Sequence, residues 1–300
     1  MRSLSLPVLC TLALATVVYA GPRRCGDDVD GRGRSVPCDC GDVLVGSRTL
    51  SDDDPITTRV CPGTGLMVVV PPHRSAKLVL GHRGLVGSGR GFGIQIVGSD
   101  PAAVTIVGPG SVRGFDVGVF APAGQLESIA DVTAAENRSD GFRLNGNGYS
   151  VTGCEAIANG RDGFVLGGVG YRSERNRALG NRRNGFRAAG RDAAIGGREG
   201  NEASQNGRDG LHVRGRGHDV RGAVATGNGR RGVAARIAEG SIADAKTRDN
   251  RDRGVVATGA RLKVTGTEAQ EQRGIHVRGN AVRDGGGNSA ASCIIGGPCR

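Results

Sequence analysis

Arginines recur at a fixed spacing through the second half of this sequence. Four of them stand two residues before a glycine and are 22, 25 and 22 residues apart: Arg161, Arg183, Arg208 and Arg230. A further set stands two residues after glycines of the same series: Arg143, Arg187 and His212. Cations that repeat at a regular interval suit a polymeric anion whose charges also repeat. If the fold stacks the four turn arginines at the ~4.8 Å strand spacing, they form a positive stripe about 15 Å long.

The aspartates beside these arginines leave a second interpretation open. Asp140, Asp162 and Asp209 are close neighbours of the arginines in sequence. The alternative to a binding stripe is therefore a set of exposed turn charges that only keeps the protein in solution.

The glycines belong to a repeat that extends from Gly141 to Val277. Each unit reads glycine, an apolar residue, any residue, then a small or apolar residue, and successive glycines are 22, 22, 25, 22, 22 and 20 residues apart. A fixed period in this range is the signature of a solenoid. The repeat glycines are Gly141, Gly163, Gly185, Gly210, Gly232, Gly254 and Gly274.

An asparagine precedes most of these glycines by four residues. Asparagine tolerates left-handed backbone geometry at a sharp turn, and its amide can both donate and accept a hydrogen bond. Asparagines stacked at the strand spacing can therefore bond to one another in a ladder. The predicted ladder consists of Asn137, Asn159, Asn181, Asn206, Asn228 and Asn250.

The residues within each unit alternate as they do in a β-strand. Phe142, Leu144 and their equivalents would point inward, and Arg143 and its equivalents outward. The return segments are short, broken by glycine and again alternating, which favours two or three short strands per coil over a leucine-rich repeat. The predicted fold class is all-β, a right-handed parallel β-helix of about nine or ten coils. The 25-residue step predicts three extra residues looped outward between Arg191 and Glu202.

The chain divides into four predicted segments. Residues 1–20 combine a positive start, an apolar run and small residues before Gly21, which predicts a signal peptide and an exported, periplasmic or extracellular protein without a transmembrane segment. Residues 21–64 contain four cysteines and are expected to cap the first coil. Residues 65–283 hold the β-helix repeats, and residues 284–300 are expected to cap the last coil, because a solenoid must shield its ends.

Seven cysteines remain after the predicted cleavage, and six of them lie near the two ends. In an exported chain such clusters indicate disulfides. These six are Cys25, Cys38, Cys40, Cys61, Cys293 and Cys299. The last two can close a local loop, whereas the first four allow three connectivities. We favour Cys25 with Cys38 and Cys40 with Cys61, and we expect the remaining Cys154 to be a buried, inert thiol.

A second column of charged residues alternates in sign. Opposite charges on neighbouring coils can pair at about 0.2 to 1 kcal/mol each, so this column indicates stabilisation of the strand register. A general-acid role for Glu155 or Glu202 is the alternative, and it requires a partner at a defined separation. The column reads Glu155, Arg177, Glu202, Val224, Lys246 and Glu268.

Other chemistries find little support in the residue types. His212 and His276 lie three coils apart, about 14 Å, which is too far to share an ion, so no metal site is predicted. No cofactor is predicted, and calcium at Asp28–Gly31 is a minor alternative to a solvated turn. The chain has no Trp, which disfavours neutral glycans that stack on aromatic rings. Basic residues without exposed aromatics likewise disfavour specific nucleic-acid binding.

The formal net charge of the chain is +11, which becomes +10 when Arg2 leaves with the predicted signal peptide. A basic chain favours acidic partners such as acidic polysaccharides or anionic head groups. Only three of the 40 basic residues are lysines, so 37 are arginines. This skew has a second explanation in a GC-rich genome.

Several short motifs resemble those of a known family. They are Cys40-Gly41-Asp42, Thr49-Leu50, Asp53-Asp54-Pro55, Cys61-Pro62-Gly63, Leu78–His82, and the Asn-Gly-Arg-Asp-Gly units at Asn159–Gly163 and Asn206–Gly210. Together they look like the secreted bacterial right-handed parallel β-helix repeat proteins, which are similar in fold to pectin lyases and to periplasmic β-helix proteins of copper-site maturation. The resemblance implies architecture and no single activity, because that superfold hosts lyases, hydrolases, epimerases and proteins without a known reaction.

We expect a non-catalytic binding or scaffold protein that presents a basic face to an acidic polysaccharide or another envelope component. The alternative is a polysaccharide lyase, or a related enzyme such as a glycoside hydrolase, acting on a uronate polymer with Arg187 or Arg208 near the substrate carboxylate. A second alternative, a metallochaperone-like accessory protein, follows only from the family resemblance.

Overall fold

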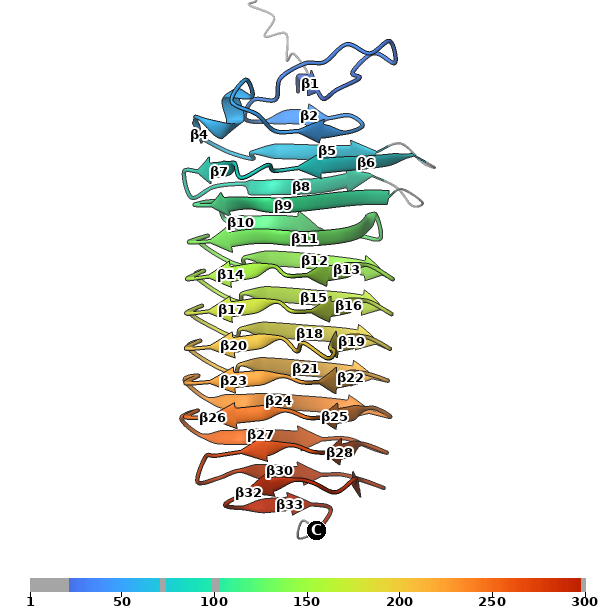
Figure 1. The fold of residues 1–300 in the computed structure, drawn as a ribbon, viewed down its shortest axis with the longest axis vertical. Helices are drawn as coiled ribbons and strands as arrows, with labels where there is room; N and C mark the ends of the chain where they lie inside the picture. The colour runs from blue at the N-terminus through green and yellow to red at the C-terminus, as the bar shows by residue number, and fades with distance from the viewer. Residues whose placement is uncertain (1–21, 71–73, 99–102, 298–300) are drawn as a thin grey trace, which may run out of the picture.

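The chain forms one continuous solenoid of parallel β-strands in the computed structural model (Figure 1). The structure describes residues 22–70, 74–98 and 103–297, so the predicted signal peptide lies outside it. Among these residues, thirteen strands stack one per coil into the first sheet. In stacking order they are β1 (Arg24–Cys25), β2 (Asp42–Leu44), β5 (Leu66–Val70), β8 (Phe92–Gly98), β10 (Val117–Ala121), β12 (Phe142–Asn147), β15 (Phe164–Val169), β18 (Phe186–Arg191), β21 (Leu211–Arg216), β24 (Arg231–Ala238), β27 (Arg253–Thr258), β30 (Ile275–Arg278) and β33 (Cys293–Ile295).

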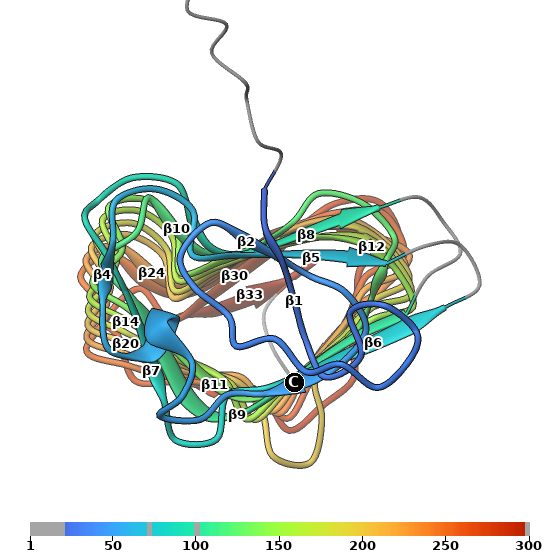
Figure 2. The same cartoon turned by 90° about the horizontal axis from the view of Figure 1, so that it is seen from above.

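The return path of the coils forms two further stacks, and the view down the axis shows the coils superposed (Figure 2). Two long strands, β9 (Ala103–Arg113) and β11 (Leu126–Ala135), run through both stacks. The second stack also contains β3 (Arg48–Thr49), β6 (Ser75–Val79), β13 (Ser150–Thr152), β16 (Arg172–Glu174), β19 (Ala194–Gly196), β22 (Asp219–Arg221), β25 (Ser241–Ala243), β28 (Lys263–Thr265) and β31 (Arg283–Asp284). The third contains β4 (Val60–Cys61), β7 (Gly84–Gly87), β14 (Glu155–Ile157), β17 (Arg177–Leu179), β20 (Glu202–Ser204), β23 (Val224–Thr226), β26 (Lys246–Arg248), β29 (Glu268–Ala269) and β32 (Ser289–Ala290).

The stacks confirm the predicted fold class, a right-handed parallel β-helix. The expected coil number was too low, because the solenoid makes about 12 turns. Strands at both ends account for the difference: β1 pairs with β2, β2 pairs with β5, and β33 pairs with β30. The cysteine-containing ends therefore extend the solenoid as well as closing it.

Side chains at equivalent positions stack on one another inside the coils. Phe142, Phe164 and Phe186 have ring centroids 4.8 and 4.7 Å apart, and Tyr149 stacks on Tyr171 at 5.3 Å. All five side chains are buried. Burial of a large apolar side chain such as Phe stabilises a fold by about 1.5 to 3 kcal/mol. The inward register predicted from the alternation is therefore confirmed, and it carries the core.

The predicted asparagine ladder runs along the turn that leads into the first sheet. Asn159 Nδ2 donates to Asn181 Oδ1 at 2.9 Å, and Asn181 Nδ2 donates to Asn206 Oδ1 at 3.0 Å. In each of these rungs the backbone N–H donates to the same oxygen, and Nδ2 also reaches a carbonyl of the preceding coil. The ladder comprises Asn137, Asn159, Asn181, Asn206, Asn228 and Asn250.

Two details of this turn were not anticipated. The left-handed backbone falls on the residue before the asparagine, such as Ala158 (φ 52°) and Gln205 (φ 55°), so the expectation that asparagine takes this geometry was wrong. The preceding residue makes the bend, and the asparagine side chain is thereby turned into the coil. The ladder also ends on a buried carboxylate, because Asn250 Nδ2 donates to Glu271 Oε1 at 2.6 Å.

The repeat glycine is required by the ladder of the next coil. A Cβ on Gly163 would lie 2.8 Å from Asn181 Nδ2 and 2.7 Å from the carbonyl oxygen of Gly185. Real Cβ atoms essentially never approach other atoms this closely. Glycine and asparagine therefore recur together because the absence of one side chain makes room for the other.

A shorter set of buried amides lies at the bend between the second and third stacks. The Cys154 backbone N–H donates to Asn176 Oδ1 at 2.9 Å, and Asn176 Nδ2 donates to Asn201 Oδ1 at 3.1 Å. Cys154 thus holds the equivalent position in its own coil. It is a free, buried thiol, and burial raises its pKa to about 12, in agreement with the predicted inert cysteine.

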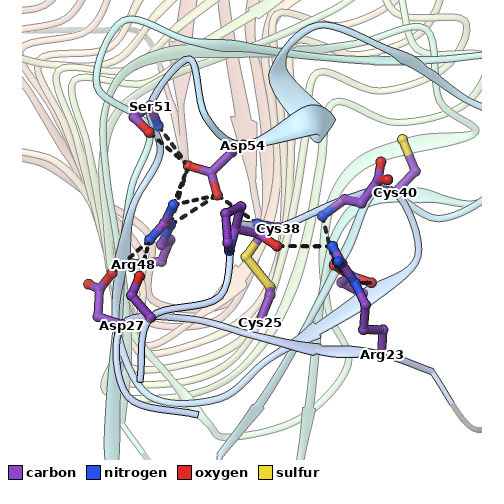
Figure 3. Close-up of a disulfide and its surroundings, with 12 residues drawn as sticks. Arg23, Cys25, Asp27, Cys38, Cys40, Arg48, Ser51 and Asp54 are labelled. Carbon is purple, nitrogen blue, oxygen red and sulfur yellow. Dashed lines mark hydrogen bonds and ion pairs between the residues drawn. A yellow bond between two sulfur atoms is a disulfide. The ribbon is translucent and has the colours of Figure 1, made fainter. Parts of the chain in front are cut away.

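Both favoured pairings of the N-terminal cysteines are confirmed, because Cys25 bonds to Cys38 and Cys40 bonds to Cys61. The predicted pair of Cys293 with Cys299 includes a residue outside the described part of the chain. The first disulfide lies beside a buried ion pair of Arg48 and Asp54 (Figure 3). Figure 3 also shows Arg48 reaching Asp27, at 3.0 Å.

Asp54 connects three parts of the first coils. Its Oδ1 accepts from the Cys38 backbone N–H at 2.7 Å, and its Oδ2 accepts from the Ser51 N–H at 2.8 Å and from Arg48 Nη2 at 2.9 Å. Burial alone would raise the pKa of Asp54, but these hydrogen bonds lower it below its ordinary value. Asp54 therefore joins the first disulfide, the Ser51 backbone and Arg48 in the N-terminal segment.

The predicted insertion is confirmed at the bend of one coil. Five residues, 197–201, separate β19 from β20, where the preceding coil has two, 175 and 176, between β16 and β17. Arg198 and Glu199 are exposed on this longer loop. The three additional residues leave the strand register unchanged.

Candidate functional site

The four turn arginines lie on consecutive coils, one directly after another. The backbone N–H of Arg183 donates to the Arg161 carbonyl, that of Arg208 to Arg183, and that of Arg230 to Arg208, each at 2.9 Å. The outward column of the first sheet is equally regular, since Arg187 pairs with His212 and His212 with Ala234. The sequence-predicted residues therefore share one side of the solenoid, at the turn and on the adjoining strands.

A row of buried polar side chains lies between these two columns. Asp162 Oδ1 accepts from the Asn184 N–H and from Asn184 Nδ2, both at 2.9 Å, and Asn184 Oδ1 accepts from the Asp209 N–H at 3.2 Å. Asp140 accepts from the Asp162 N–H at 3.1 Å in the same manner. Each of these side chains thus accepts a hydrogen bond from the backbone of the next coil.

The carboxylates of this row pair with residues other than the turn arginines. Arg143 Nε donates to Asp140 at 2.9 Å. Asp209 accepts from Arg231 through Nε at 2.8 Å and through Nη2 at 2.9 Å. Within the described part of the chain, no carboxylate forms an ion pair with Arg183, Arg187, Arg208, Arg214 or Arg230. These arginines therefore have no ion-pair partner among the neighbouring aspartates.

The unpaired arginines surround a hollow of about 300 Å³, which we call the arginine groove. The groove brings together most of the residues predicted from sequence and leaves two of them out. Arg143 is held by Asp140, and Arg161 lines a separate hollow with Arg90 and Arg138. The groove is lined by Asp162, Arg183, Asn184, Arg187, Arg208, Asp209, His212, Arg214 and Arg230.

His212 and Asp209 form a polar pair inside the groove. His212 Nδ1 lies 3.1 Å from Asp209 Oδ2, and the aspartate side chain is only 2% exposed. Burial alone would raise the pKa of Asp209, but hydrogen bonds from His212 and Arg231 outweigh it and lower the pKa to about 2. Asp209 is therefore a fixed negative charge that orients one histidine and one arginine.

The sequence pattern did not reveal this pair. Asp209 and His212 are three residues apart, which in a regular strand puts side chains on opposite faces. The buried repeat glycine Gly210 lies between them at a bend of the chain, and the two side chains meet outside the coil. Arg143 and Asp140 repeat the same spacing. The sequence did contain a signal for such pairs: an aspartate one residue before the repeat glycine and a basic residue two residues after it.

Metal-ligating side chains do not gather in the described residues. No group of three or more His, Cys, Asp or Glu side chains there could hold an ion. At the turn considered for calcium, Asp28 Oδ1 accepts from the Gly33 N–H at 2.7 Å and Asp30 Oδ1 from the Arg32 N–H at 3.0 Å. None of the described helices is long and apolar enough to cross a membrane.

The stacked sheets place the protein in the class of right-handed parallel β-helices. No family model and no curated protein matches the sequence. Among solved structures, the chain is similar to the A-module of the mannuronan C-5 epimerase AlgE4 from Azotobacter vinelandii, with 16% identity over 86% of this chain and 88% of that one and a TM-score of 0.48.

The chain is also similar to two longer proteins. One is the Dettilon tailspike protein, with 16% identity over 85% of this chain and 56% of that one and a TM-score of 0.48. The other is the Agl-KA catalytic domain, with 9% identity over 79% of this chain and 50% of that one and a TM-score of 0.43. The chain thus spans about half the length of these two proteins. The likeness to all three extends to the fold alone.

Proposed function

We propose that this protein binds an acidic polysaccharide along the arginine groove. The observation that supports this proposal is the set of guanidinium groups without carboxylate partners, stacked on consecutive coils around one hollow. Like charges in register on adjacent coils are destabilising, so an anionic partner would stabilise an unpaired column. A polymer with one acidic group per unit meets this column along its length.

The strength of binding follows from the geometry of the column. A guanidinium carries five N–H donors in a planar fork that matches a carboxylate or sulfate. Because the groove is open to solvent, each such contact contributes at most about 1 kcal/mol, and salt weakens it.

The test removes three turn arginines together. In the triple variant Arg183→Ser, Arg208→Ser and Arg230→Ser, we expect polygalacturonate affinity to fall on the order of 100-fold, since each lost contact is worth about 1 kcal/mol. Titration calorimetry at two salt concentrations measures this. The matched control, Arg172→Ser with Arg221→Ser and Lys263→Ser, removes the same charge from the second stack. Equal losses in both variants would mean that net charge alone attracts the polymer.

A second candidate function, uronate lyase activity, is favoured by the His212–Asp209 pair. With a proton on Nδ1, the other ring nitrogen of His212 is free to accept one. A base at this position could remove the C5 proton beside a uronate carboxylate. The bond from C4 to the oxygen of the next sugar would then break, a double bond would form between C4 and C5, and the departing oxygen would take a proton from water. Arg187, next to His212 in register, is placed to neutralise that carboxylate.

Activity and binding are separated by one substitution. If the lyase hypothesis is correct, ultraviolet absorbance of unsaturated uronate ends rises with the native protein, and His212→Ala abolishes the rise while binding persists. His276→Ala, in the same outward column but outside the groove, is the control. A flat absorbance with the native protein on every polyuronate tested leaves binding as the function.

Export is part of the proposal. Two disulfides close the N-terminal coils, and disulfides persist in oxidising compartments. Together with the predicted signal peptide, they support a periplasmic or extracellular location. N-terminal sequencing of the protein recovered from an expressing bacterium is expected to begin at Gly21; a chain that begins at Met1 in the cytoplasm would contradict this.

A further inference from the structure

A second hollow continues the arginine groove along the first sheet. It has a volume of about 180 Å³ and shares His212 and Arg214 with the groove. Ala234, which is only 4% exposed, and the half-buried Val256 follow His212 in the outward column and line this hollow. We call this hollow the Ala234 slot. Its outward side chains are His212, Arg214, Arg231, Ala234, Arg236 and Val256.

The slot exists because the outward column has a small side chain, that of Ala234, at one coil. Arg187 and His212 precede Ala234 in the column, and Val256 and His276 follow it. Alanine has the smallest side chain of these five, so the surface is lowest at β24. The floor of the slot is therefore apolar, whereas the floor of the arginine groove carries Asp162, Asn184 and Asp209.

The walls of the slot are cationic on both sides. Arg231 stands on one side, and its guanidinium is fixed by two hydrogen bonds to Asp209, at 2.8 and 2.9 Å. Arg214 and Arg236 are paired in register on the other side and have no carboxylate partner among the described residues. A guanidinium that is already held in place loses less conformational entropy on binding an anion. The slot thus combines an apolar floor with one guanidinium held by Asp209 and two without a carboxylate partner among the described residues.

This combination selects among polyanions. A sugar ring has an apolar face of C–H groups and, in a uronate, a carboxylate at its edge. The face can lie against Val256 over the recessed Ala234 while the edge meets an arginine. A phosphate chain has charge but no apolar face. A water molecule takes about 30 Å³ of liquid, so the slot holds the equivalent of about six waters, enough for one small ring.

We propose that the Ala234 slot binds one uronate ring of the polysaccharide and that Ala234 limits the size of the unit accepted there. The inference rests on the proposed function and adds to it a substrate class, uronate polymers rather than polyphosphate. It also assigns a specificity role to a residue without charge.

The test fills the slot with the side chain that the same column already uses in other coils. Val165 and Val256 occupy this column, so Ala234→Val is compatible with the strand. We expect it to weaken polygalacturonate binding at least about tenfold, the range in which a hydrophobic pocket responds to a methyl group, and to leave polyphosphate binding unchanged. Ala189→Val, the same substitution on β18 outside both hollows, should change neither.

The outcomes separate the slot from the groove. If polygalacturonate binding depends on the turn arginines but is unchanged by Ala234→Val, the proposal for the slot is wrong and the proposed function still holds. An equal loss of both polymers in a variant with the native melting temperature also overturns the slot, because it removes the distinction between them. A native protein that binds neither polymer overturns the proposed function itself. If Ala234→Val lowers the melting temperature, Val256→Leu fills the slot from the next coil and is judged by the same criteria.

Discussion

Two outward surfaces of this solenoid use arginine differently. On the third stack, Arg177 lies between Glu155 and Glu202 of the neighbouring coils, 3.8 Å from each, and Lys246 meets Glu268 at 3.9 Å. On the side formed by the first sheet and its turn, the turn arginines of the groove lie on consecutive coils, and the nearby aspartates bind the backbone, His212 and Arg231.

The difference shows that arginine content alone does not mark a binding surface. The third-stack pairs confirm that opposite charges of this column meet across neighbouring coils, and at about half exposure each contributes at most about 1 kcal/mol. In the arginine groove, by contrast, like charges lie on neighbouring coils. The rest of the fold must therefore offset their repulsion. Unpaired charge in register, rather than charge as such, is the feature to test.

The largest loss of stability is expected in the asparagine ladder, because both surfaces depend on it. Asn206→Ala removes a ladder side chain and leaves the N–H and Nδ2 of Asn181 without their acceptor. Unpaired buried polar groups cost about 1 to 3 kcal/mol each, so we expect the free energy of unfolding to fall by about 3 to 5 kcal/mol. Chemical denaturation measures this, and Asn147→Ala, at an exposed asparagine, is the control. An equal response of both variants would mean that the ladder contributes nothing specific.

A smaller loss of stability is expected at Asp209, which lines the groove but is ion-paired as the third-stack charges are. Its pKa is lowered from 3.8 to about 2, so its charge stabilises the fold above pH 4, and this contribution is lost as the pH falls toward 2. Asp209→Asn should therefore reduce the free energy of unfolding on the order of 2 kcal/mol at pH 7, with the difference vanishing near pH 2. Denaturation across this pH range tests it; a difference that is independent of pH would contradict the assignment.

The smallest loss of stability is expected when the carboxylate partners of an arginine on the third stack are removed. Glu155→Gln with Glu202→Gln leaves Arg177 without its partners, and we expect a loss of at most about 1 kcal/mol per pair. Polygalacturonate should bind this variant slightly better at low salt, as affinity electrophoresis can detect. Glu127→Gln with Glu136→Gln changes the net charge equally without freeing an arginine. The same gain in both would show that the polymer responds to net charge only.

Local pattern was sufficient for some of the site and not for the rest. The spacing of the turn arginines and of the ladder asparagines predicted which residues share a column, because equivalent positions on adjacent coils are hydrogen-bonded neighbours. It did not predict that Asp209 would bind His212 and Arg231, or that Glu271 would end the ladder. These contacts depend on a bend at the repeat glycine and on the shorter, 20-residue step between Gly254 and Gly274.

The sequence by itself determined the period, the inward and outward registers and the ladder. These follow from contacts between neighbouring repeats, and a regular repeat brings the same residues together in each coil. The tertiary structure decided which charges are neutralised, where the groove and the Ala234 slot lie, and how far the ends extend the solenoid. Each of these depends on the directions of side chains from several coils at once. A one-dimensional pattern of residue types does not contain those directions.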